Sequence, residues 1–164
     1  MYEIKPTIKG EDVEYKLPDP AFYEALGFEG MQDLMYRFYD EIYESDIANF
    51  FPQDEEEFNK VKVKNSKFFI QLCGGPKVYE DEAKGMDLNE YMIRVHDDFS
   101  IPDKARYEWL GCMKVVLDKT EGVSQELKDD FWNYLESFSK LTVNTFADGD
   151  VYYASYKPEA VKKQ

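Results

Sequence analysis

The chain has 164 residues, of which 43% are hydrophobic, and it carries a net charge of −14. This composition favours one domain with a substantial core over a disordered acidic segment. The excess of acidic residues argues against nucleic acid and anionic membranes as partners, because both attract clustered Lys and Arg. The sequence shows no signal-peptide pattern and no apolar run near the roughly 20 residues of a membrane span. We therefore expect a soluble, cytoplasmic protein.

Residues 1–20 are polar and contain three prolines. They predict an N-terminal extension that is extended or partly ordered, rather than a second domain. From Phe22 the apolar residues recur at helical spacing. The first long helix is indicated by one apolar stripe: Met31, Leu34, Met35, Phe38, Tyr39 and Ile42.

A second helix is predicted after Phe50-Phe51-Pro52, with its entry in the acidic run 53–57, where carboxylates suit the helix dipole. Its inward face carries Phe58, Val61, Asn65, Phe68 and Leu72. Gly74-Gly75-Pro76 should end this helix abruptly. Residues 77–89 are polar and favour a loop.

A short helix over about 88–95 should carry His96 at or just past its end. Pro102 suits the first turn of the next helix, whose apolar stripe is Trp109, Leu110, Met113, Val116 and Leu117. Ser124 is a plausible N-cap for a last helix. Together these segments predict an all-α domain of five to seven helices over residues 21–147, followed by a C-terminal tail over 148–164.

His96 is the only histidine in the chain. One imidazole cannot build a histidine-rich zinc site or a two-histidine relay, but it can hold one haem iron from one side. Taken alone, such a residue is more often a surface or capping histidine. The two thiols, Cys73 and Cys112, have neither the Cys-x-x-Cys spacing nor the nearby histidines of a redox or metal site. We interpret both as small buried residues.

Four motifs occur in a fixed order along the chain: Phe38-Tyr39, Gly74-Gly75-Pro76, His96 and Trp109-Leu110-Gly111-Cys112-Met113. Each is weak alone, but the ordered set resembles the truncated haemoglobins, in particular their group II, over roughly residues 22–146. The resemblance implies a globin-like fold, a two-over-two helical sandwich around haem. Because the chain has no Cys-x-x-Cys-His motif, that cofactor should be non-covalent haem b.

The resemblance implies that His96 is the proximal iron ligand, with its second ring nitrogen donating to a backbone carbonyl or a similar acceptor. Tyr39 matches the distal tyrosine, and Trp109 matches a distal-side tryptophan. Asn65 falls where group II members place a residue that faces the ligand, and a buried amide there needs a partner. Val61 occupies the place of the distal histidine of ordinary globins. The alternatives are simple packing for the two aromatic residues and a solvent-facing Asn65.

Further residues should contact the cofactor. Phe51, or its neighbour Phe50, resembles the aromatic residue that wedges the haem. Lys64 and Arg94 are candidates for binding its propionates, although the family's usual basic position is Val95 here. Pocket or core lining is expected of Phe68, Phe99, Trp109 and Met113, among others.

The resemblance implies a haem protein that binds dioxygen, and also nitric oxide, carbon monoxide or sulfide. Nitric oxide detoxification or peroxide chemistry would need a separate reductase, so an enzymatic role stays open. The alternative is a haem-free globin-fold interaction or sensor module. A third hypothesis treats the acidic surface as a docking face for a basic redox partner. The oligomeric state is left open.

Overall fold

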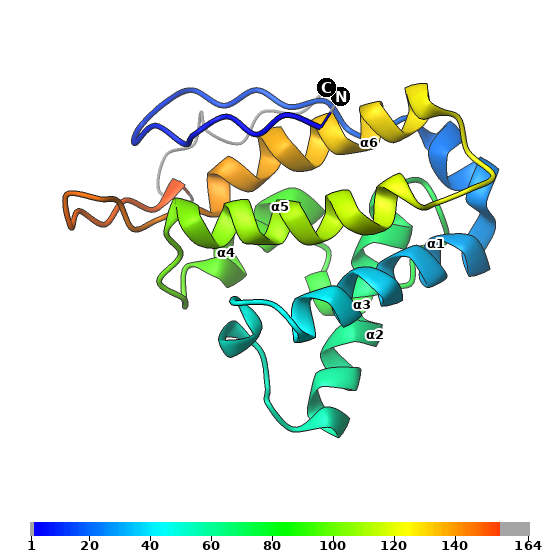
Figure 1. The fold of residues 1–164 in the computed structure, drawn as a ribbon, viewed down its shortest axis with the longest axis horizontal. Helices are drawn as coiled ribbons and strands as arrows, with labels where there is room; N and C mark the ends of the chain where they lie inside the picture. The colour runs from blue at the N-terminus through cyan, green and yellow to red at the C-terminus, as the bar shows by residue number, and fades with distance from the viewer. Residues whose placement is uncertain (1, 155–164) are drawn as a thin grey trace.

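The computed structural model describes residues 2–154, which form an all-α fold (Figure 1). In chain order the elements are α1 (Pro20–Tyr43), η1 (Ala48–Phe50), α2 (Glu55–Leu72), α3 (Glu80–Ala83), α4 (Leu88–His96), α5 (Asp103–Asp118), α6 (Gln125–Phe138) and η2 (Ser139–Thr142). Within the described residues there is no β-strand, and only isolated bridges join Thr145 to Pro102 and to Val151. No helix in this part of the chain is long and apolar enough to cross a membrane. The predicted fold class and helix number are confirmed.

The first helix begins at a cap that the sequence encodes. The Asp19 carboxylate accepts a hydrogen bond from the Ala21 amide at 2.9 Å, and Pro20 fills the first helical position. Every residue of the apolar stripe predicted for this helix is buried. Gly27 has a φ of 75° and kinks the helix, which a residue with a side chain would resist. The helix packs against α2, α5 and α6.

The second helix ends where the glycine pair was expected to end it. Gly74 has a φ of 100°, the left-handed conformation that follows many helices. Gly75 lies so close to the Ile70 carbonyl and the Tyr23 ring that an added Cβ would come within 3 Å of both. The two glycines therefore have different roles: Gly74 allows the backbone to turn, and Gly75 allows close contact with α1.

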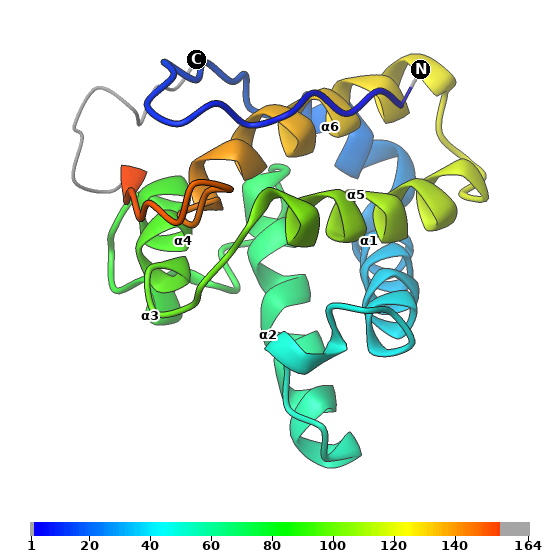
Figure 2. The ribbon, with the colours of Figure 1, turned by 60° about the vertical axis from the view of Figure 1, so that its left-hand side comes forward.

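The loop expected over 77–89 contains one helical turn, α3, and then α4 places His96 as its last residue. As predicted, Ser124 caps α6: its hydroxyl accepts a hydrogen bond from the Leu127 amide at 3.2 Å. Helices α5 and α6 lie alongside one another and α2 crosses beneath them, as the turned view shows (Figure 2).

The N-terminal extension is extended, and it runs along α6 in both views (Figures 1 and 2). Its Val13 and Tyr15 are buried in the same hydrophobic core as the helices, and Ala154 at the other end belongs to that core as well. The segments expected as appendages thus share one core with residues 21–147. Residues 155–164 of the expected tail lie outside the described residues.

Candidate functional site

A cavity of about 340 Å³ lies among α1, α2, α4, α5 and α6. Its walls are mostly aromatic and aliphatic, with a few polar groups, which is the usual make-up of a ligand pocket. The residues proposed from the sequence that line it are Tyr39, Phe51, Val61, Lys64, Asn65, Phe68, His96, Phe99 and Trp109. Most of the candidate residues, distant from one another in sequence, are therefore brought together.

Two candidate residues are not brought to the cavity. Met113 has no exposed surface and packs in the core one helical turn beyond Trp109, outside the cavity lining. Arg94 points outward from α4 and pairs with Glu90 one turn earlier at 3.2 Å. The cavity lining therefore does not include these two residues, and their contact with a cofactor stays a prediction.

His96 presents one free ring nitrogen to the cavity. Its Nδ1 lies 2.6 Å from the carbonyl oxygen of Met92. A carbonyl can only accept, so Nδ1 carries the proton and Nε2 keeps its lone pair. Burial lowers the pKa of His96, an effect that the Met92 hydrogen bond and Asp97 oppose. The ring is therefore held neutral and oriented, the state in which imidazole ligates a metal.

The α1 and α2 side of the cavity carries a phenol next to an amide. Burial raises the pKa of the Tyr39 hydroxyl well above its usual range, and a hydrogen bond with Asn65 partly offsets this. The phenol therefore stays protonated and able to donate. Val61, which also lines this side, offers no hydrogen-bonding group. Tyr39 and Asn65 are the polar pair on this part of the wall.

The two tryptophans of the chain differ in their hydrogen bonding. The Trp132 indole donates to the Glu3 carbonyl at 3.0 Å, outside the cavity. Trp109 lines the cavity and packs edge-on against Phe38, with ring centroids 5.3 Å apart. No described residue accepts a hydrogen bond from its indole N–H, so Trp109 has a donor to offer.

Phe50 and Phe51 both line the cavity, so the structure does not separate the two candidates for the wedging aromatic residue. Phe51 packs against Tyr39 at 6.1 Å between ring centroids, and Phe50 packs against Phe99 at 6.4 Å.

Lys64 lies at the rim, where its side chain is exposed and forms no ion pair with a described residue. A cation in that position is free to meet an anionic group at the cavity mouth.

Several lining residues were not proposed from the sequence, among them Tyr79, Tyr91, Tyr134 and Arg106. Tyr134 donates to the Asn89 side chain, so its hydroxyl is already engaged. Arg106 is fully buried and donates to Ser139, to the Lys5 carbonyl and to Glu136. Its side chain therefore connects α5 to η2, to the N-terminal extension and to α6. No local sequence pattern predicts that these residues line the cavity, because their positions depend on contacts between segments that are far apart in the sequence.

The described residues contain no group of three or more His, Cys, Asp or Glu side chains that could hold a metal ion by themselves. A metal at His96 would therefore need its other ligands from elsewhere, and haem brings four of its own. A largely apolar cavity with one neutral imidazole and a lysine at the rim fits that cofactor.

Comparisons with known proteins agree with this geometry. The model of the family described as bacterial-like globin matches residues 21–144. Phosphate-bound Hell's gate globin IV shares the fold at a TM-score of 0.75 and 24% identity, covering 97% of this chain and 99% of that one. The comparison with curated proteins found no match.

Two further solved structures are similar over about three quarters of the chain. The group II truncated haemoglobin from Bacillus anthracis is 27% identical at a TM-score of 0.65, covering 76% of this chain and 97% of that one. The truncated oxygen-avid haemoglobin from Bacillus subtilis is 28% identical at a TM-score of 0.65, covering 75% of this chain and 98% of that one. The chain belongs to the bacterial-like globin family, and it is a truncated globin.

Proposed function

We propose that this protein binds haem b non-covalently, with His96 as the iron ligand, and reversibly binds dioxygen there. The family and the fold suggest haem-based gas binding. The observation that carries the proposal is the state of His96, whose Nδ1–H donates to Met92 and whose Nε2 is left free at the cavity. Bound haem would supply an iron with one coordination position for a diatomic gas.

The chain's own residues would then act on that gas. The Tyr39 hydroxyl, kept protonated by burial, would donate a hydrogen bond to a ligand with partial negative charge. Asn65, which lowers the pKa of the Tyr39 hydroxyl, would help to orient the phenol, and Trp109 would supply a second donor. These donors favour slow release, because each hydrogen bond to the ligand must break on departure. The chain has no other histidine that could compete for the position.

At the cavity mouth, Lys64 would pair with a haem propionate, and the aromatic walls would exclude water from the macrocycle. The same pocket would accept nitric oxide, carbon monoxide or sulfide. Turnover of nitric oxide or of peroxide would need electrons from a separate reductase. We therefore propose ligand binding as the main function.

The test is an absorption spectrum of the purified protein in its oxidised, reduced and carbon monoxide forms, compared with His96→Gly. We expect a Soret band that shifts with carbon monoxide, is lost or weakened in the variant, and returns when imidazole is added. A protein that takes up no haem, even when haem is supplied, would overturn the proposal. That result would favour a haem-free interaction or sensor module with this fold.

A further inference from the structure

The end of α4 depends on a residue far away in the sequence. His96 is the last residue of this helix, and the final carbonyls of a helix have no partner within it. The His96 carbonyl accepts from the Phe99 amide at 3.1 Å, and Asn144, which follows η2, adds a second donor from a distant segment: its amide Nδ2 lies 3.3 Å from the His96 carbonyl oxygen and 2.9 Å from that of Phe99. Its Oδ1 accepts from the Ile101 amide at 2.9 Å.

The Asn144 backbone binds the same loop. Its N–H donates to the Ile101 carbonyl at 3.0 Å, and its own carbonyl accepts from the Tyr152 amide at 2.9 Å. Asn144 is only 3% exposed, so these hydrogen bonds are shielded from water. The three residues that it holds, His96, Phe99 and Ile101, all line the cavity.

We propose that Asn144 is the residue that positions His96 as the iron ligand, an inference that rests on the proposed function. Two hydrogen bonds fix the histidine from opposite ends. The Met92 carbonyl orients the ring, and the Asn144 amide holds the backbone from which the ring extends. Without Asn144 the end of α4 would keep only its local turn hydrogen bonds, from the Asp97 amide to Arg94 and from the Phe99 amide to His96, and would open more readily.

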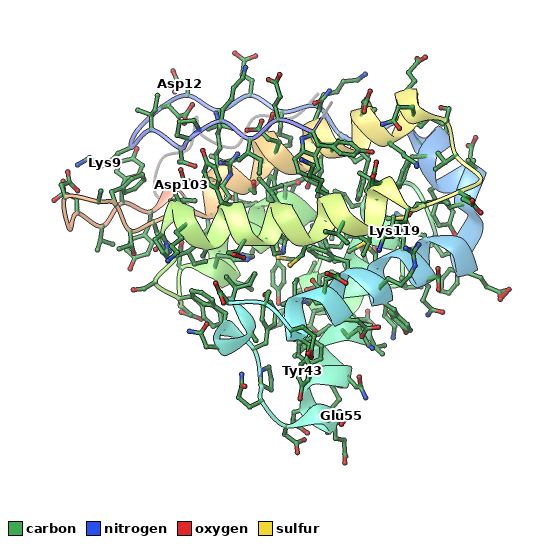
Figure 3. The ribbon with its side chains drawn as sticks, viewed as in Figure 1. Lys9, Asp12, Tyr43, Glu55, Asp103 and Lys119 are labelled. Carbon is green, nitrogen blue, oxygen red and sulfur yellow. The ribbon has the colours of Figure 1, made fainter. Side chains whose placement is uncertain are left out.

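The segment that presents Asn144 is itself anchored. Thr145 bridges to Val151, and the turn between them carries Asp148 and Asp150, both paired with Lys9 of the N-terminal extension. Lys9 lies beside this turn in Figure 3. Residues beyond 144 and before 21 lie outside the span that the family model matches. Both added segments thus support the loop that follows His96.

The test uses Asn144→Asp and Asn144→Ala in the full-length chain. The aspartate can still accept from Ile101, but it cannot donate to the two carbonyls and would repel them. The control is Thr120→Val, which removes a buried hydroxyl with hydrogen bonds, just beyond the C-terminal end of α5 and away from the cavity lining. Two readouts apply: the iron–histidine stretching band in the resonance Raman spectrum of the reduced protein, and amide hydrogen exchange.

We expect the Raman band to shift to lower frequency or broaden in both Asn144 variants and to stay unchanged in Thr120→Val. The Ile101 amide should exchange about tenfold faster in Asn144→Ala, which removes its acceptor, and the Phe99 amide should exchange faster in both variants because the end of α4 is loosened. Variants whose band and exchange both match the wild type would overturn the proposal while leaving the proposed function intact. A wild-type protein that shows no such band would instead overturn the proposed function, and the exchange rates would still report whether Asn144 holds the loop.

Discussion

The indole N–H of Trp132 donates to the carbonyl oxygen of Glu3 at 3.0 Å, across 129 positions of sequence. The Tyr2 ring packs on the same indole at 5.1 Å between centroids. Further along, the Arg106 guanidinium donates to the Lys5 carbonyl, and the Thr7 hydroxyl donates to Asp103. The N-terminal extension is therefore bound to α5 and α6 by a series of specific hydrogen bonds.

Tyr15 of this extension has an unusual hydroxyl group. The side chain is 3% exposed and packs edge-on against Tyr134 and Phe138, yet its hydroxyl has no hydrogen-bond partner among the described residues. Burying a hydroxyl without a partner costs free energy. Tyr15→Phe should therefore leave the free energy of unfolding unchanged or raise it by up to about 1 kcal/mol.

Urea denaturation of three variants tests this prediction. Tyr15→Ala should lose roughly 3–5 kcal/mol, because it removes a buried aromatic ring. Tyr134→Phe is the matched control, since its hydroxyl donates to Asn89, and it should lose about 1–2 kcal/mol. A clear loss of stability in Tyr15→Phe would mean that the hydroxyl has a partner after all.

Dioxygen release should depend on Tyr39 more than on Asn65, because Tyr39 carries the donor and Asn65 mainly orients it. We expect Tyr39→Phe to speed release by about 10- to 100-fold, the range for losing a hydrogen bond to a partly charged ligand. Asn65→Ala should have a smaller effect. Stopped-flow measurements of dioxygen dissociation check both variants.

Tyr43→Phe is the control for that series. Tyr43 lies one turn after Tyr39 on α1, outside the cavity lining, and its hydroxyl bonds to the Gln53 carbonyl at 3.2 Å. Its release rate should equal that of the wild type. Equal or reversed effects of the Tyr39 and Asn65 variants would show that the assignment of the donor is wrong.

Local signals account for the parts of the structure that the sequence predicted. The buried stripe of α1, the end of α2 before Gly74 and the Ser124 cap each depend on residues within one or two helical turns. Such patterns fix where a helix begins, ends and turns its apolar face. They also bring Tyr39, Asn65 and His96 to one cavity, once the helices pack.

Long-range contacts account for what the sequence did not predict. Asn144 acts on His96 across 48 positions, and no spacing in its own segment marks it. Met113 was predicted from its spacing, but it does not line the cavity: it shares the apolar stripe of α5 with Trp109 and is buried in the core. A helical pattern identifies the buried face of a helix without saying which neighbour covers it.

Both thiols should react slowly in the folded protein. Burial raises the pKa of Cys112 to about 11, with Ser45 partly offsetting it, and burial raises the pKa of Cys73 further. Because the thiolate is the reactive form, Ellman's reagent should modify the native thiols on the order of 100-fold more slowly than the same thiols in urea. Cys112, at 8% exposed, should react before Cys73, which is fully buried. Rapid native labelling of Cys73 would contradict its buried position.

The contribution of His96 to the stability of the haem-free protein should fall as the pH drops below about 6.5. Its folded-state pKa lies below the unfolded value, chiefly through burial, so the unfolded chain binds the proton first. The stabilising contribution is fully present above the unfolded pKa and is lost as the pH falls toward the folded one. For one proton, the slope of the unfolding free energy against pH cannot exceed about 1.4 kcal/mol per pH unit.

Urea denaturation between about pH 7.5 and 5.5 tests this effect, since no second histidine titrates in that window. His96→Gln should remove the slope, and a wild-type stability that rises toward low pH would show that the imidazole is not buried in its neutral form.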